Sequence, residues 1–377
     1  MLYKDFFWGA ATSAYQVEGG VEANDWAAAG RTGLLPLAGR AADHRSFFQH
    51  DFDIARELGH NAHRFSIEWS LVEPEEGRFD EKELERYLTV AKALKERGIE
   101  PFVTIWHFTL PLWFSKTGGF KRKDSAEVFC RYARKVVSVL GGEVKFFITI
   151  NEPLVFASNG FLKGKWPPLE KSFLNFFKIL SRLEEAHKLA FTAIKGMFPE
   201  AQVGIAKNNI DFESNANPLN FLKTIFLRWF WNRRFLDKIF DYQDFVGINY
   251  YFYRKSGGKE KCETSDMGWA IHPKGLYSVL REVKFYQKPV YVFENGLADK
   301  ADVKRAEFLR THIEELKRAM EDGVSVRGYF HWSLIDNFEW DEGFGPRFGL
   351  VEVNYKTMER KIRPSALVYK KLIQENS

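Results

Sequence analysis

Cysteine is scarce in this sequence, which has only Cys130 and Cys262 among 377 residues. Two thiols are too few for a disulfide scaffold, and these two form no CxxC pair. We therefore expect a protein of a reducing, cytoplasmic compartment. The N-terminal segment lacks a basic stretch followed by a long apolar one, so we also expect no signal peptide.

Long apolar runs and blocks of like charge are also missing. No apolar run reaches about eighteen residues, so we expect no transmembrane segment. The 55 basic and 50 acidic residues are interspersed and give a net charge of +5, so we expect no nucleic-acid partner. Because no linker-like tract or repeat interrupts the chain, we expect one domain over residues 1–377.

Aromatic residues, in contrast, are abundant: 36 Phe, 14 Tyr and 11 Trp make up 16% of the chain. Large rings fill protein cores, and they also form flat platforms for sugars and other apolar faces. Composition leaves both interpretations open.

Short apolar runs separated by helical patterns give the chain a repeating strand–helix rhythm. Most of these runs are nearly continuous in apolar residues, as parallel strands buried on both faces require. Eight such units predict the α/β class and a single (β/α)8 TIM barrel. The runs are Phe6–Ala14, Asn61–Trp69, Pro101–His107, Lys145–Asn151, Gln202–Asn208, Asp244–Tyr250, Pro289–Glu294 and Val326–Trp332.

One intervening helix has clear end signals. Asp80 is an N-cap candidate and Glu83 follows three residues later, which predicts a capping box. Gly98 ends the pattern. Between them, the apolar residues that share one helical face are Leu84, Tyr87, Leu88, Ala91 and Leu94.

Polar side chains gather at the carboxyl ends of the eight runs, where a barrel of this kind carries its chemistry. We expect them to form the rim of one pocket. They are Gln16, Arg64, Glu68, His107, Asn151, Glu152, Asn208, Asn249, Tyr251, Glu294, Asn295 and Trp332, followed by Glu339 and Trp340.

Two carboxylates stand out on this rim. Glu152 ends the fourth run and Glu294 ends the seventh, so their side chains can converge across the mouth of an eight-stranded ring. Two facing carboxylates, one acid and one nucleophile, are what hydrolysis of a glycosidic bond requires. The structural alternative makes both residues helix caps or salt-bridge partners, but an Asn beside each favours chemistry.

Two other classes of function compete with this interpretation. A non-catalytic sugar-binding barrel would lack one of the two carboxylates, and both are present. A metal-dependent hydrolase would need clustered His and Asp ligands at strand ends. Because His60 and His63 straddle the start of one run instead, we expect no metal site.

An ordered set of motifs runs through the chain: Phe7–Gln16, Arg64–Ser70, His107–Trp113, Thr149–Pro153, Asp244–Tyr251, Met267–Trp269, Glu294–Gly296, Trp332–Trp340 and Arg347–Leu350. Together they resemble the signatures of glycoside hydrolase family 1, the β-glucosidase family, and most closely its archaeal or thermophilic branch. The resemblance spans about Leu2 to Tyr369.

The resemblance implies a role for each matching residue. Glu152 would be the general acid and base, and Glu294 the nucleophile of a retaining, double-displacement reaction that needs no cofactor. Arg64 would face Glu294 and lower its pKa, and Tyr251 would donate a hydrogen bond to the same carboxylate. The negative charge of Glu294 would raise the pKa of Glu152.

The same resemblance implies a sugar-binding set. Trp332 would form a floor for the sugar ring, Trp269 would contact the aglycone, and Asn249 would lie near the acid. The hydroxyl-binding residues would be Gln16, His107, Asn151, Glu339 and Trp340. Taken one at a time, some have a simpler interpretation: a core histidine at His107, core rings at Trp332 and Trp340, a helix cap at Gln16, and an Arg64–Glu68 pair.

Some positions depart from the family pattern. Phe293 stands where the family usually carries Thr, and we expect its side chain to point outward from the strand. Phe344 replaces the usual Tyr. The loops around Val21–Ala42 and Gly257–Ser265 are short, which leaves the aglycone site and the oligomeric state open.

The implied partner is a small β-glycoside, with an alkyl or oligosaccharide aglycone. Glu at position 152 argues against a thioglucosidase, and the carboxylate of Glu339 would repel a 6-phosphate, so we expect a neutral glycone. The choice among glucose, galactose, fucose and mannose stays open.

The segment Pro218–Phe240 is basic and aromatic. We interpret it first as an outer barrel helix that is partly buried. The alternative is contact with a membrane surface or with a lipid aglycone.

Overall fold

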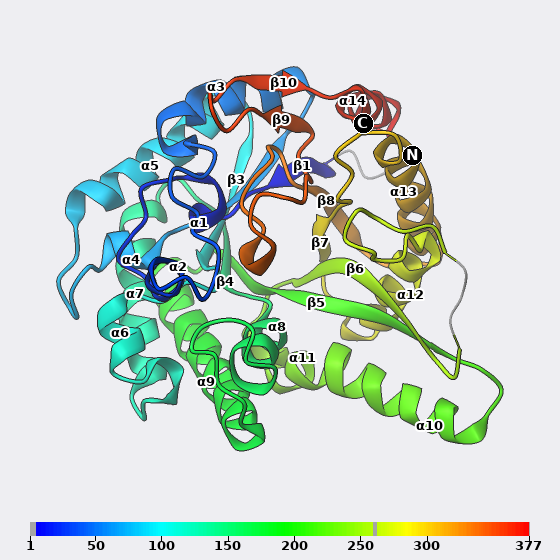
Figure 1. Cartoon of the computed structure of the whole chain (residues 1–377), viewed down its shortest axis with the longest axis horizontal. Coiled ribbons are helices and arrows are strands. Elements are labelled where there is room, and N and C mark those ends of the chain that lie inside the picture. The colour runs from blue at the N-terminus through cyan, green and yellow to red at the C-terminus, as the bar shows by residue number, and fades with distance from the viewer. Residues whose placement is uncertain (1–4, 259–261, 377) are drawn as a thin grey trace.

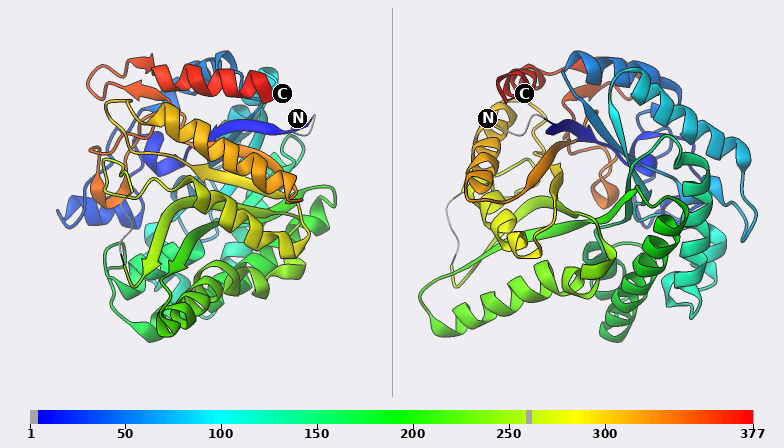
Figure 2. Two further views of the ribbon diagram at one scale, coloured as in Figure 1. Left: turned by 90° about the vertical axis from the view of Figure 1, so that its right-hand side faces the viewer. Right: turned by 180° about the vertical axis from the view of Figure 1, so that it is seen from behind.

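A computed structural model describes residues 5–258 and 262–376, and Figures 1 and 2 show the path of the chain. Eight parallel strands pair in sequence order and close into a barrel, with helices around it (Figure 1). The predicted (β/α)8 architecture is therefore confirmed. The strands are β1 (Phe7–Ala11), β2 (Ala62–Ser66), β3 (Glu100–Trp106), β4 (Phe146–Asn151), β5 (Gln202–Ser214), β6 (Val246–Ser256), β7 (Val290–Asn295) and β8 (Val326–Trp332).

The helices connect these strands and cover the outside of the barrel (Figure 2). The α-helices are α1 (Ala14–Val17), α2 (Asp25–Arg31), α3 (His44–Glu57), α4 (Trp69–Val72), α5 (Glu81–Glu96), α6 (Leu112–Lys116), α7 (Ser125–Leu140), α8 (Pro153–Ala157), α9 (Phe173–Met197), α10 (Pro218–Leu227), α11 (Arg234–Lys238), α12 (Pro273–Val283), α13 (Arg305–Glu321) and α14 (Pro364–Asn376).

Shorter elements complete the chain. Two small strands, β9 (Val351–Val353) and β10 (Arg360–Ile362), form an antiparallel pair. The single-turn helices are η1 (Gly119–Lys121), η2 (Ser158–Leu162), η3 (Arg228–Arg233), η4 (Phe240–Tyr242), η5 (Lys284–Tyr286) and η6 (Trp340–Glu342).

Four strands end several residues away from the ends of the predicted runs. The runs ending at Ala14 and Trp69 extend too far, because α1 and α4 begin within or directly at their ends. The runs ending at Asn208 and Tyr250 stop too early, because β5 and β6 go on pairing with each other as far as Ser214 and Ser256. The paired extension projects beyond the apolar part of the barrel.

Helix α5 follows the predicted pattern. The Asp80 side chain caps it by accepting from the backbone N–H groups of Lys82 and Glu83. The reciprocal half of the capping box does not form, because the Glu83 carboxylate pairs with Arg45 and Arg86 instead. Of the predicted apolar face, four residues are buried and Leu88 is half-buried.

Aromatic rings from different sides of the ring of strands fill the barrel interior. Phe293 on β7 is fully buried there and lies 5.6 to 5.8 Å, centroid to centroid, from Phe102, Phe245 and Phe330. The prediction that Phe293 points outward is therefore wrong. Gly247 on β6 makes room for it, since a Cβ at this glycine would lie 2.4 Å from the Phe293 ring.

Candidate active site

A pocket of about 280 Å³ opens at the carboxyl ends of the strands. Ten of the twelve predicted site residues line it, and the other two, Arg64 and Asn249, are buried beside it. The predicted residues on its wall are Gln16, His107, Asn151, Glu152, Tyr251, Trp269, Glu294, Trp332, Glu339 and Trp340.

Glu294 receives two strong donors on separate oxygens. Arg64 Nη1 lies 2.5 Å from Oε1, and the Tyr251 hydroxyl donates to Oε2 at 2.9 Å. Burial raises the pKa of Glu294, while the charge and hydrogen bond of Arg64 and the bond from Tyr251 oppose the rise. The predicted lowering effect of Arg64 on this pKa is therefore confirmed in direction, although burial outweighs it.

Local backbone geometry delivers Glu294 to the pocket. The register of β7 shifts against β8 between Val292 and Asn295, and β6 shifts against β7 at Asn249. Such irregularities re-aim side chains next to active sites. The next position, Gly296, must be a glycine, because a Cβ there would lie 1.9 Å from the Trp332 carbonyl oxygen.

Arg64 is held on several sides. Its Nε donates to the Thr104 hydroxyl at 2.9 Å and its Nη2 to Asn151 Oδ1 at 2.7 Å. Its guanidinium carbon lies 5.4 Å from the centroid of the Phe293 ring. The planar fork thus spans three polar partners and rests on an aromatic ring, which fixes the cation beside Glu294. The simpler Arg64–Glu68 pairing does not occur.

Glu152 has a different environment. It precedes Pro153 at the N-terminus of α8 with a φ of 44°, a left-handed conformation that is uncommon for non-glycine residues. Asn249 and Asn208 donate amide hydrogens to its Oε1, at 2.8 and 3.3 Å. Burial, and next the negative charge of Glu294, raise the pKa of Glu152 to about 8.

The two carboxylates therefore differ in the groups that contact them. Glu294 has a guanidinium at 2.5 Å, whereas the direct donors to Glu152 are neutral amides. The cation beside Glu294 favours the charged form of that carboxyl, whereas burial and the charge of Glu294 favour the protonated form of Glu152.

A hydrogen-bonded cluster lies opposite this pair. Gln16 Nε2 donates to the Phe338 carbonyl at 2.7 Å and lies 3.4 Å from Glu339 Oε2. Burial, and then the charge of Glu294, raise the pKa of Glu339 to about 8. Asn151 lies 3.1 Å from His107 Nε2 and also accepts from Arg64, so it links His107 to Arg64. Such groups can both donate to and accept from the hydroxyls of a sugar.

Indole rings bound the pocket. His107 is nearly parallel to both Trp332 and Trp340, with centroids 6.1 and 6.0 Å away. Trp26 on α2 packs behind Trp340 at 4.8 Å, so the short Val21–Ala42 loop supports this wall. Trp269 stands at the outer side, 4.7 Å from the ring of Phe252.

Some predicted positions do not belong to the wall. Glu68 turns away and bonds Ser70 and Thr109, and Asn295 joins the Tyr250 carbonyl to the Tyr329 hydroxyl. Phe344 packs on Phe338 and Tyr355 without lining the pocket. Of the other short loop, residues 259–261 lie outside the described residues.

Sequence reasoning missed several groups that the structure brings to the site. Lys207 is fully buried behind Asn208, and burial lowers its pKa to about 7. Trp166 lines the mouth, as do the cationic residues Lys163, Lys165 and Arg254. A polar lysine inside the otherwise apolar run Gln202–Asn208 was the one available signal.

Candidate metal ligands gather at one place in the part of the chain that the structure describes. The one group of His, Asp and Glu side chains there that could hold an ion is Asp211, Glu213 and His272, none of which lines the pocket. Within residues 5–258 and 262–376, no helix has both the length and the apolar character to cross a bilayer.

Comparisons with known proteins agree with the site. The sequence pattern described as Glycosyl hydrolase family 1 matches residues 1–240 and 237–377. A β-glycosidase from Pyrococcus horikoshii has a similar structure, with a TM-score of 0.93 and 38% identity over 99% of this chain and 95% of that one. A β-glucosidase from Thermotoga maritima in complex with glucoimidazole gives a TM-score of 0.94 and 31% identity, over 99% of both chains.

A curated relative extends the agreement to sequence alone. The 1,4-β-D-glucan glucohydrolase of Thermotoga neapolitana is 34% identical over 434 aligned positions, which cover 98% of each chain. The family match, the sequence relative and the similar structure each cover nearly the whole length of this chain. The two carboxylates of the predicted motifs, Glu152 and Glu294, both line the pocket. The chain belongs to glycosyl hydrolase family 1 and is a retaining β-glycosidase.

Proposed function

We propose that Glu294 is the nucleophile and Glu152 the acid and base of this β-glycosidase. The observation that supports the assignment is the contact of Arg64 with Glu294 at 2.5 Å, against the neutral amides and the pKa of about 8 at Glu152. An ionised carboxylate and a protonated one then face the same bond, as the retaining mechanism requires.

In the first step, Glu294 Oε attacks the anomeric carbon while the bond to the aglycone oxygen breaks. Glu152 gives its proton to that oxygen, and a covalent glycosyl ester forms on Glu294. Esterification removes the negative charge of Glu294, so the pKa of Glu152 falls. Glu152 then accepts a proton from water, whose oxygen attacks the anomeric carbon and frees Glu294.

We infer that the glycone is a neutral β-D-sugar, with β-glucosides as the first candidates. Gln16, Glu339 and His107 supply donors and acceptors for ring hydroxyls, and Trp332 supplies a flat face. Relatives from Thermotoga are named β-glucosidases and a Pyrococcus woesei relative is a β-galactosidase. Glu339 disfavours a 6-phosphate, since its carboxyl, with a pKa of about 8, supplies no positive charge and would repel a phosphate whenever it ionises.

A panel of p-nitrophenyl β-glycosides tests the assignment. We expect turnover of the β-glucoside or β-galactoside, and a loss of about 10⁵-fold or more in Glu294→Ala. Added azide should rescue Glu294→Ala with formation of the α-glycosyl azide, and Glu152→Ala with formation of the β-glycosyl azide. Exchanged anomers would reverse the two roles, and full activity of both variants would refute the site.

We propose a second property, contact of α10 with anionic lipid surfaces and use of alkyl or lipid-linked aglycones. Thr224 is the only fully buried residue of α10, which lies at the edge of the molecule in Figure 1. Basic residues outnumber acidic ones five to one over Pro218–Phe240, which matches an anionic bilayer. Apolar side chains exposed by 46 to 75% are Leu219, Phe221, Leu222, Ile225, Phe226 and Trp229.

Alkyl β-glucosides of increasing length and vesicles containing phosphatidylglycerol test this second property. We expect kcat/KM to rise with chain length and the protein to sediment with the vesicles. Leu222→Glu should weaken both effects, whereas Leu367→Glu, an exposed leucine on α14, should change neither. A flat chain-length series and no sedimentation would leave α10 a purely structural helix.

We also propose a reducing, cytoplasmic location. The chain has only two cysteines, Cys130 and Cys262, which are too few for a disulfide scaffold and fit a reducing compartment. Fractionation of the source cells, with activity followed in each fraction, tests this assignment.

A further inference from the structure

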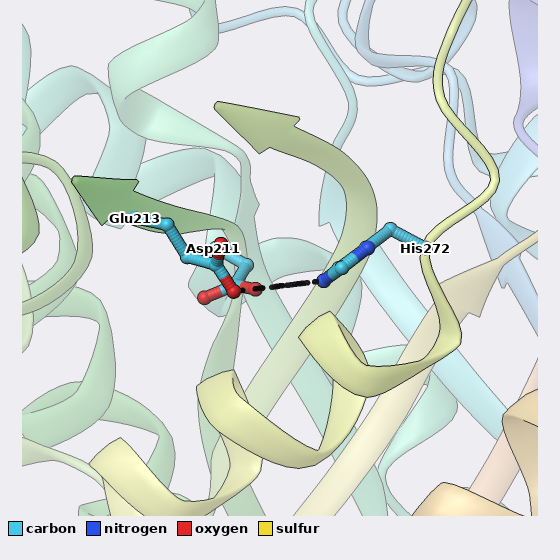
Figure 3. A group of neighbouring side chains, drawn as sticks. All are labelled: Asp211, Glu213 and His272. Carbon is cyan, nitrogen blue, oxygen red and sulfur yellow. Dashed lines mark ion pairs between the residues drawn. The ribbon is translucent and has the colours of Figure 1, made fainter. Parts of the chain in front are cut away.

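A second cluster of ionisable side chains lies outside the pocket, on the extension of β5 (Figure 3). Asp211 and Glu213 are two residues apart on this strand and therefore share one face. His272 precedes α12 and points toward them. Its Nε2 lies 3.4 Å from Asp211 Oδ2 and 4.0 Å from Glu213 Oε1.

The cluster contains buried polar atoms without hydrogen-bond partners. Asp211 is only 4% exposed, and neither its Oδ2 nor His272 Nε2 takes part in a hydrogen bond. Among the described residues, His272 is the only group within ion-pair distance of Asp211. Two carboxylates thus share one imidazole, and buried polar atoms of this kind call for a partner.

The pair His44–Asp51 shows how the same chain satisfies a buried aspartate. There His44 Nδ1 lies 2.7 Å from Asp51 Oδ2, and Arg360 Nε donates to Oδ1 at 2.8 Å. A guanidinium therefore compensates that carboxylate. No residue plays the part of Arg360 within the described surroundings of Asp211.

The ligand atoms are also held in place by their neighbours. The His272 ring stacks on Tyr253 with centroids 4.0 Å apart, and the Tyr253 hydroxyl donates to Glu213 Oε2 at 2.8 Å. The Tyr250 hydroxyl donates to the His272 carbonyl at 2.7 Å. These contacts fix the ring and one carboxylate oxygen while Nε2 and Oε1 still face Asp211, as outer-shell partners do around metals.

We propose that Asp211, Glu213 and His272 bind a divalent transition-metal ion through Oδ2, Oε1 and Nε2, with water completing the coordination. Bonds of about 2.1 Å to a tetrahedral ion such as Zn²⁺ separate the ligand atoms by about 3.4 Å. The His272–Asp211 distance already has this value, and the partly exposed Glu213 needs only a small movement. One imidazole with two carboxylates suits Zn²⁺ or Mn²⁺ better than the all-oxygen ion Ca²⁺.

The ion has a structural task rather than a catalytic one. It joins the projecting part of β5 to the start of α12, three residues after Trp269 at the outer side of the pocket. Ile271 N, in the same segment, bonds the Glu263 carbonyl at 2.7 Å. Loss of the ion should therefore loosen the wall that carries Trp269, raising KM for bulky aglycones more than it lowers kcat.

Calorimetric titration of tag-free, chelator-treated protein with Zn²⁺, and separately with Mn²⁺, tests the proposal. We expect saturation at one ion per chain and a rise in Tm on binding. Asp211→Asn and Glu213→Gln should weaken binding at least 10-fold, whereas Glu263→Gln, an exposed carboxylate on the neighbouring loop, should not. Co²⁺ bound by the wild type should give visible absorption bands that both variants lose.

Two results would overturn the site. Absence of saturable binding, with an imidazolium signal from His272 in nuclear magnetic resonance spectra, would identify a simple His–Asp ion pair. Equal binding by the wild type and all three variants would show that the ion binds elsewhere on the surface. If Asp211→Asn fails to fold, Glu213→Gln still decides, because Glu213 is partly exposed at the tip of the strand.

Discussion

Glu294 and Glu152 face one pocket, yet the chain surrounds them with different groups. Around Glu294 lie a guanidinium, a phenol and a packed aromatic floor. Around Glu152 lie two amides, with Lys207 behind them as a buried cation that does not touch the carboxylate. Burial favours the protonated form of both carboxylates, so the direct cation at one of them supports the different roles that we propose for the two.

Removing that cation should have the largest effect. Arg64→Met leaves Glu294 buried without its charge partner, and we expect kcat/KM to fall about 10³-fold, or about 4 kcal/mol. The pKa of Glu294 should rise, so the acidic limb of the pH profile should move to higher pH. Arg64→Lys is the control. It keeps the positive charge but loses the forked hydrogen bonding that includes Asn151, so its kcat/KM should lie between those of the wild type and of Arg64→Met. An unchanged acidic limb in Arg64→Met would separate Arg64 from the ionisation of Glu294.

The comparison also shows what the sequence could reveal. Apolar runs followed by polar residues located all eight strands and ten of the residues that line the pocket, since both signals are local. The inward position of Phe293 depends on a register shift in β7 and on the space left by Gly247, and neither is visible in one strand alone. Glu68 has the same local pattern as the true wall residues, but Ser70 and Thr109 capture it.

Clusters that form between distant segments could not be predicted from the sequence either. Asp211 and His272 come together only because β5 and β6 keep pairing past the predicted strand ends. The conformation of Glu152 at the start of α8 and the burial of Lys207 are likewise properties of the assembled barrel.

The pH dependence of kcat/KM tests the other half of the comparison, the environment of Glu152. The reaction needs protonated Glu152, whose pKa is about 8, so kcat/KM should fall about tenfold per unit above that pH. The charge of Lys207 lowers this pKa, but Lys207 itself has a pKa of about 7 and is mostly neutral at pH 8, so Lys207→Met should move the basic limb only slightly to higher pH. Glu152→Gln should lose the limb altogether. A basic limb that persists in Glu152→Gln would assign it to another group.

A smaller effect is expected from the aromatic floor. Phe293→Leu removes the ring beside Arg64 while keeping an apolar side chain, and we expect kcat/KM to fall about 3- to 10-fold, within the range of a buried cation–π contact. Unfolding experiments should show a loss of about 1–2 kcal/mol in stability. Phe245→Leu serves as the control, because this buried ring also packs on Phe293 but belongs to neither β2 nor β3, the strand pair that includes Arg64, and we expect a similar stability loss and a smaller change in activity. Equal activity losses would mean that Phe293 acts only through packing.

The smallest effect should come from the outer side, where neither carboxylate is touched. Trp269 is half-buried and packs on Phe252, so Trp269→Ala removes an apolar face for the aglycone and leaves the sugar site intact. We expect KM for aryl and long alkyl glucosides to rise about 2- to 3-fold, with little change for methyl glucoside. Release of sugar from the covalent glycosyl-enzyme, measured after the aglycone has left, should keep its rate. A slower release would show that Trp269 acts together with the catalytic groups, so that the aglycone side and the sugar site could not be treated as separate parts of the pocket.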